Sequence, residues 1–223
     1  MNNSPVIHSA TFEFLKAINE HNSRKYFASI RPLYDQVLED ITIFCQQLIN
    51  TLAEHDSSLQ WLQAKDCLFR IYRDARRIKE WDPLYKNNFG FHIGKDGKKW
   101  TDAGYYVQFQ EGNCLLAGGI YRPTPEQLLK LRQKISLHGD EYLKITQKKE
   151  FVWRFGEIQW TITTKIPRGF PKDINYPDLV KRKQHLIYHR YEDAEVVRED
   201  FFEKITKDCN IAKQRFDRLN DIL

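Results

Sequence analysis

The apolar residues of this 223-residue chain change their spacing twice along its length. Over 31–54 they recur every three to four residues, which predicts one long helix with a buried face. Pro32 suits its first turn, because backbone N–H groups there have no acceptor within the helix and the N–H that proline lacks is not needed. A shorter helix is expected before it, capped by Ser9 or Thr11. Helical spacing returns from about Asp193. The buried face of the long helix is expected to carry Leu33, Val37, Ile41, Phe44, Leu48 and Leu52.

Between these helical parts the sequence shows the signals of strands and turns. Short aromatic and β-branched runs predict strands at 69–73, 88–93, 105–110, 114–120 and 185–190. Asp96-Gly97 and the run EGN predict the turns of two hairpins. A third hairpin is expected from 151–155 and 158–163. One helix interrupts the strands, from Thr124 as its cap to about residue 137, with Gly139 as its stop.

This order of elements predicts an α+β fold with a mainly antiparallel sheet, built from hairpins and flanked by N-terminal and C-terminal helices. We expect a single domain over 1–223, since its length fits one large domain. Its parts are a helical segment at 9–56, a sheet-rich middle at 67–190 and a helical segment at 193–223. A hydrophobic content of 41% is sufficient for a sizeable core.

Charge and cysteine content restrict the class of protein. A net charge of +5 permits an anionic partner without requiring one. No cysteines form a CxxC pair, and three of the four have apolar or aromatic near neighbours, as is typical of buried free thiols. The sequence shows neither a secretory signal nor an apolar run of about 20 residues, so we expect a reduced, cytoplasmic protein with no membrane partner. The cysteines are Cys45, Cys67, Cys114 and Cys209.

Several common chemistries lack their motifs. The chain has no phosphate-binding GxxxxGK[ST], no GxGxxG and no GxSxG. His185 and His189 share a face, yet no third ligand accompanies them, so hydrogen-bonded or solvated histidines are favoured over a metal site. We therefore expect no metal and no cofactor.

The segment FRIYRDARRIKEWDPLYK (69–86) carries more positive charge than its carboxylates offset. So many cations repel one another unless carboxylates or a bound anion neutralise them. Guanidinium groups offer forked donors that match phosphate or carboxylate. The alternative is a structural network in which Arg73 and Asp74 tie the loop to the sheet. Candidate ligand-binding residues are Arg70, Arg73, Asp74, Arg76, Lys79, Tyr85 and Lys86, with Arg168 from the loop 167–177.

The same segment resembles the signature of the family catalogued as domain of unknown function 2461, RxxRDxRF followed by an acid-lysine pair and a tyrosine. Further blocks at 12–27, 105–110, 118–135 and 166–183 resemble other parts of that family. The resemblance implies no established activity. The chain departs from the signature at three positions: Arg77 replaces the phenylalanine, Trp81 replaces the lysine, and Leu84 is an extra residue.

Three functions stay open. The first is binding of a small phosphate- or carboxylate-bearing ligand by the arginine-rich segment. The second is a hydrolase or transferase acting on such a ligand, with Asp74 or Tyr85 moving protons. The third is interaction with nucleic acid or protein through a basic surface, although no nucleic-acid motif is present. The sequence indicates nothing about the oligomeric state.

Overall fold

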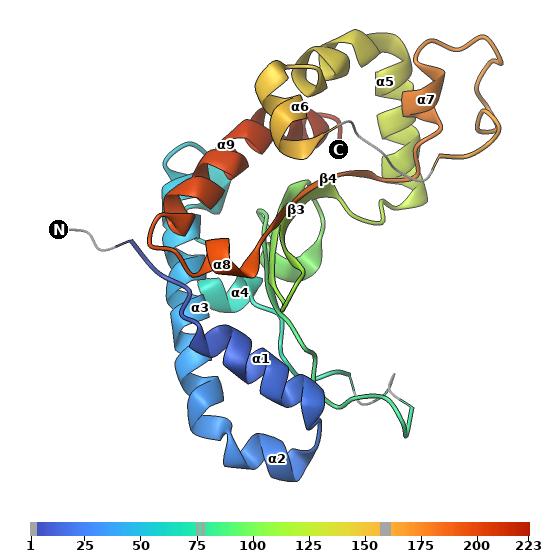
Figure 1. Ribbon diagram of the computed structural model, residues 1–223. Helices are drawn as coiled ribbons and strands as arrows, with labels where there is room; N and C mark the ends of the chain where they lie inside the picture. The colour runs from blue at the N-terminus through green and yellow to red at the C-terminus, as the bar shows by residue number, and fades with distance from the viewer. Residues whose placement is uncertain (1–3, 75, 77–78, 157–161) are drawn as a thin grey trace.

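The computed structural model describes residues 4–74, 76, 79–156 and 162–223. Figure 1 shows its helices gathered around a four-stranded sheet. The strands are β1 Phe89–Ile93, β2 Gly104–Phe109, β3 Cys114–Ile120 and β4 His185–Tyr191. The longer helices are α1 Ala10–Glu20, α3 Arg31–Ala53, α5 Pro125–Thr146 and α9 Phe201–Asn220. The shorter ones are α2 Arg24–Ser29, η1 Ser57–Leu59, α4 Ala64–Cys67, η2 Gly97–Lys99, α6 Lys149–Phe155, α7 Pro177–Val180 and α8 Asp193–Val196.

The sheet is antiparallel, with the strand order β1-β2-β3-β4. Helices α3 and α9 lie against one of its faces (Figure 1). Aromatic rings fill the space between these layers: Phe44 of α3 meets Phe109 of β2 at 5.6 Å, and Phe216 of α9 meets Tyr105 at 4.9 Å between ring centroids. The α+β class, the antiparallel sheet and the flanking helices are therefore as the hydrophobic patterning predicts.

Several local predictions are confirmed. Helix α3 occupies 31–53 with Pro32 in its first turn, and its predicted stripe is buried except for Leu33, which packs partly buried against the core. Thr124 caps α5 in a capping box with Gln127, in which each side chain bonds the other's backbone N–H. The predicted strands at 88–93, 105–110, 114–120 and 185–190 are present within one or two residues. No helix in the described ranges is long and apolar enough to span a membrane.

The predicted strand at 69–73 is absent. Only two isolated bridges tie this stretch to the sheet and to itself, Leu68 to Phe91 and Tyr72 to Tyr85. Its apolar residues alternate as in a strand, but the chain leaves the sheet edge after Phe69, whose N–H bonds to the Gly90 carbonyl. Beyond it, the Ile71 carbonyl accepts a bond from the Lys86 N–H instead. The predicted polar break at 21–27 also differs, because Ser23 caps the short helix α2 by accepting a bond from the Tyr26 N–H.

The predicted hairpin at 151–163 is wrong in its first half, because 149–155 form helix α6. Phe151 and Phe155 are four residues apart, so a helix places them side by side, and their rings lie 5.2 Å apart. Gly156, expected in a β-turn, ends this helix with a φ of +68°. Residues 157–161 lie outside the described ranges.

Gly139 does not stop α5, which continues to Thr146 through a kink at His138. The glycine meets a packing requirement instead. The Tyr176 ring crosses the helix so closely that a Cβ at position 139 would lie 2.4 Å from it. Tyr176 itself has a φ of +54°, so the loop before α7 keeps a strained backbone where it packs on the glycine.

We expect Gly139→Ala to lower the free energy of unfolding by about 1–3 kcal/mol, although alanine favours helices, because the added methyl group would force the Tyr176 ring away. Urea unfolding measures this change. Lys134→Ala, at an exposed position of the same helix, is the control and should change stability by less than about 0.5 kcal/mol. A stabilised Gly139→Ala variant would contradict the packing argument.

Candidate functional site

A cavity of about 600 Å³ lies on the sheet face opposite α3 and α9. Strand alternation explains which side chains reach it. On β4, His185 and Ile187 point toward the helices, whereas Leu186 and Tyr188 line the cavity. Leu115 and Ala117 of β3 and Tyr106 of β2 follow the same rule.

Aromatic rings form one wall of the cavity. Trp100 stacks on Phe69, with ring centroids 6.0 Å apart and an interplanar angle of 19°. Tyr106 and Tyr121 lie 5.6 and 5.2 Å from the Trp100 ring. Behind the wall, the buried His92 ring stacks against Trp100 at 4.1 Å. The cavity therefore presents aromatic surfaces held in place by packing.

The backbone at this wall is strained. Trp100 has a φ of +58°, in the left-handed region that bulky residues seldom adopt. Arg122, next to the lining residue Tyr121, has a φ of +53°. Such strain costs on the order of 1–3 kcal/mol per residue and concentrates at binding sites. Two strained residues at one cavity mark it as a candidate functional site.

Two cations line the cavity. The Lys86 Nζ lies 5.7 Å from the Phe69 ring centroid, and the Arg190 guanidinium lies 5.5 Å from that of Tyr188. Burial lowers the pKa of Lys86 below its ordinary value, and the nearby charge of Arg73 lowers it further. Within the described ranges, neither cation forms an ion pair with a carboxylate. The cavity thus combines apolar rings with positive charge.

Most of the residues predicted for ligand binding point elsewhere. Arg70, Arg73 and Arg76 are exposed and do not line the cavity. Asp74 accepts hydrogen bonds from the backbone N–H, Nε and Nη2 of Arg76 at 3.2, 3.0 and 3.0 Å. Lys79 is exposed and lies over the Trp81 ring. Neither Asp74 nor Tyr85, the two residues expected to move protons, is among the described residues that line the cavity.

Tyr85 has a structural role. Its ring is buried and stacks on Phe27, with centroids 4.3 Å apart and planes at 9°. The Asn22 side chain accepts a bond from the Tyr85 N–H at 2.9 Å and donates one to its carbonyl at 3.0 Å. Asn22 therefore ties the end of the 69–86 segment to the N-terminal helices.

Arg168 is exposed in the loop before α7, at the opposite end of the molecule from 69–86 (Figure 1). Of the predicted residues, the structure thus brings only Lys86 to the cavity. Sequence reasoning missed Trp100, Tyr106, Tyr188 and Arg190. A usable signal was present in HLIYHRY, where alternate positions of one strand carry Leu186, Tyr188 and Arg190.

A model of the family described as Conserved hypothetical protein (DUF2461) matches residues 10–217. The chain belongs to that family. The matched range runs from α1 into the last helix, so it includes both the cavity and the 69–86 segment. Comparisons with curated proteins and with solved structures returned no match.

In this DUF2461 chain, the departures from the expected signature lie away from the cavity. Trp81 is 78% exposed, and Leu84 packs partly buried against the core while its carbonyl accepts a bond from the Arg73 N–H. Arg77 lies outside the described residues. Neither Trp81 nor Leu84 lines the cavity, so these two departures leave it intact.

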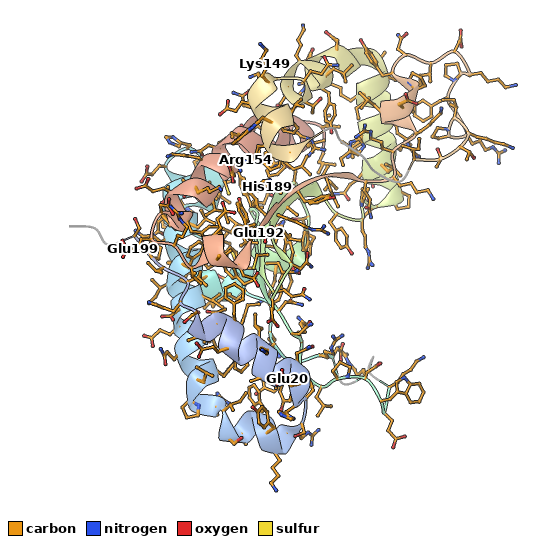
Figure 2. All side chains as sticks on the ribbon, in the orientation of Figure 1. Glu20, Lys149, Arg154, His189, Glu192 and Glu199 are labelled. Carbon is orange, nitrogen blue, oxygen red and sulfur yellow. The ribbon has the colours of Figure 1, made fainter. Side chains whose placement is uncertain are left out.

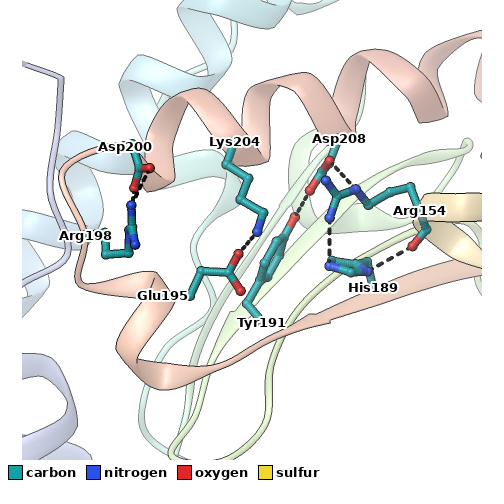
Figure 3. A network of polar contacts seen from close by, with 8 residues as sticks. All are labelled: Arg154, His189, Tyr191, Glu195, Arg198, Asp200, Lys204 and Asp208. Carbon is teal, nitrogen blue, oxygen red and sulfur yellow. Dashed lines mark hydrogen bonds and ion pairs between the residues drawn. The ribbon is translucent and has the colours of Figure 1, made fainter. Parts of the chain in front are cut away.

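A second polar cluster of the DUF2461 fold joins α6, β4 and α9 (Figures 2 and 3). Arg154 pairs with the buried Asp208 at 2.7 Å and contacts His189 Nε2 at 3.1 Å, while His189 Nδ1 contacts the Arg154 carbonyl at 2.9 Å. Tyr191 donates to Asp208 at 2.6 Å. His189 is therefore hydrogen-bonded, with Nδ1 protonated toward the carbonyl. Within the described ranges, no three His, Cys, Asp or Glu side chains gather as a metal site.

Proposed function

We propose that this protein binds a small molecule that combines a planar ring with a phosphate or carboxylate group, in the cavity on the open face of the sheet. The observation that carries the proposal is the occurrence of Lys86 and Arg190, without carboxylate partners in the described chain, beside the aromatic wall around Trp100. Concave, mostly apolar sites with a few converging polar groups are the usual form of small-molecule sites.

The two parts of such a ligand would be recognised by different interactions. Stacking of a planar ring on an aromatic side chain contributes on the order of 1–3 kcal/mol. Lys86 is half-buried, so an anion near its Nζ would be less screened than at a fully exposed lysine. Lys86 precedes β1 and Arg190 lies in β4, at the two edges of the sheet, so together they would also fix the orientation of the ligand.

A hydrolase or transferase acting on the same ligand is a weaker proposal, because among the described residues the cavity lining includes no carboxylate or histidine. Nucleic-acid binding is the second candidate, favoured by the rings and cations on one face, and its affinity would fall steeply with added salt.

We also propose a reducing, cytoplasmic location, because the four cysteines are buried free thiols.

Anilinonaphthalene sulfonate, a planar aromatic anion, is a suitable probe of the proposed site. We expect its fluorescence to rise on binding, and Lys86→Met or Arg190→Met to weaken binding about tenfold, as expected for a lost charge-assisted contact. Trp100→Leu should weaken it by a similar factor through lost stacking. Phenyl-naphthylamine, which has the rings without the sulfonate, should bind Lys86→Met as well as it binds the unmodified protein.

Lys79→Met is the matched control, because Lys79 also lies over an aromatic ring but is exposed outside the cavity. It should leave the affinity unchanged. Equal effects of Lys79→Met and Lys86→Met, in variants that unfold at the same temperature, would show that general charge rather than the cavity binds the probe.

A further inference from the structure

An arginine and a histidine are buried together on the other side of the sheet, between α5, α9 and the start of β4. We propose that Arg215 and His185 form a binding site for a small oxyanion the size of phosphate, separate from the aromatic cavity. The site lies against the helical layer, whereas the cavity opens on the opposite face.

Arg215 is 0% exposed, which is exceptional for an arginine. Its Nε and Nη2 donate to the Tyr142 hydroxyl at 3.0 and 2.6 Å, while Nη1 has no hydrogen-bond partner. In the described part of the chain, no carboxylate pairs with this guanidinium. A buried charge is stable only when an opposite charge and further hydrogen bonds compensate its lost hydration. A phenol compensates it only in part.

His185 adds a second unsatisfied group beside Arg215. Its ring is fully buried, neither nitrogen has a hydrogen-bond partner, and it meets the Tyr142 ring edge-on at 6.0 Å. The positive charges of Arg215, Arg182 and Arg132 act on this ring, and together with burial they lower its pKa to about 3. Buried polar nitrogens without partners are rare in folded proteins, so two adjacent groups of this kind point to a missing partner.

The backbone packs closely beside the guanidinium. Gly119, at the end of β3, has a φ of +111°, and a Cβ there would lie 2.0 Å from the His185 carbonyl oxygen and 3.0 Å from Arg215 Nη1. Glycine at this position therefore keeps a side chain away from the unpartnered nitrogen. Arg182 also belongs to the group, since its pKa is lowered by burial and by the charge of Arg215.

These features select the class of ligand. An acceptor with several oxygens can take the free Nη1 hydrogens and one imidazole N–H together, as a phosphate or sulfate does. A neutral acceptor would satisfy the hydrogen bonds but leave the excess positive charge. The complete burial of Arg215 and His185 favours a free inorganic anion over a group carried on a large molecule.

The test uses the whole protein, prepared without phosphate or sulfate, with inorganic phosphate as the probe. Phosphate at about 100 times its dissociation constant should raise the unfolding temperature by roughly 5–10 °C above a chloride control of equal ionic strength. In NMR spectra, phosphate should shift the ring signals of His185 and leave those of the exposed His8 and His55 in place.

Arg215→Met should abolish the phosphate-dependent rise, whereas Arg168→Met, at an exposed loop position, should retain it. Should Arg215→Met fail to fold, the His185 signals of the unmodified protein still decide the question. An unchanged unfolding temperature together with unshifted His185 signals would overturn the proposal. Loss of the phosphate effect in Lys86→Met but not in Arg215→Met would also overturn it, by assigning phosphate to the aromatic cavity.

Discussion

Asp208→Ala is expected to lower the free energy of unfolding by about 3–5 kcal/mol, as breaking a buried ion pair usually does. The Asp208 side chain is 1% exposed and that of its partner Arg154 12%. Without the carboxylate, the Arg154 guanidinium stays largely buried beside the neutral rings of His189 and Trp153, and the Tyr191 hydroxyl loses its acceptor. The loss combines an uncompensated charge with a buried donor left without a partner.

Urea unfolding of the purified variant measures this effect, and the same helix region offers a control. Arg198 and Asp200 also form an arginine–aspartate pair, through both Nε and Nη2 at 2.9 Å, but their side chains are 65% and 62% exposed (Figure 3). Asp200→Ala should therefore cost less than about 1 kcal/mol, because water replaces an exposed partner. Similar losses for Asp208→Ala and Asp200→Ala would mean that burial does not control the strength of the Arg154 pair.

The protein is expected to lose stability as the pH falls below about 6.5, because the folded state resists protonation of His185. Burial, followed by the charges of Arg215, Arg182 and Arg132, lowers its pKa to about 3. The unfolded chain therefore binds the proton first, and folding stability declines from the ordinary histidine pKa down to the folded one. A single group of this kind contributes about 1.4 kcal/mol per pH unit within that window.

Urea unfolding of the unmodified protein and of His185→Phe, at pH values from about 7.5 to 4.5, isolates this contribution. The stability difference between the two proteins should change by about 1.4 kcal/mol per pH unit below the histidine pKa, in favour of the variant. Comparing the two proteins removes the contributions of His92 and His189, whose pKa values burial also lowers. The buffer must contain no phosphate, since an anion beside Arg215 would favour the protonated ring. If the free energies of unfolding of the two proteins changed by the same amount with pH, the prediction would be contradicted.

Elements whose pattern is local could be predicted from the sequence. The apolar stripe of α3, the hairpin turn between β2 and β3, and the Thr124 cap of α5 each depend on neighbours within a few residues. Two predictions were wrong because the structure at those positions depends on residues far away in the sequence. Gly139 looks like a helix stop, but it is required by the ring of Tyr176, 37 positions away along the chain (176 − 139). The 69–73 run has the composition of a strand but pairs only through isolated bridges.

The residues of the candidate site were still harder to predict from local sequence patterns than the elements of the fold. Charge density drew attention to 69–86, yet solvent screens most of those side chains, and only Lys86 reaches a cavity. The cavity combines Phe69, Trp100, Tyr121, Tyr188 and Arg190 from separate parts of the chain, and the buried group around Arg215 likewise joins two helices and two strands.

The sequence by itself determined the family, the fold class and which face of most elements is buried. Only the tertiary structure decided which cations are exposed and which are enclosed. The physical reason is that the free energy of a charge depends on how much water the rest of the fold removes from it, and no local pattern records that.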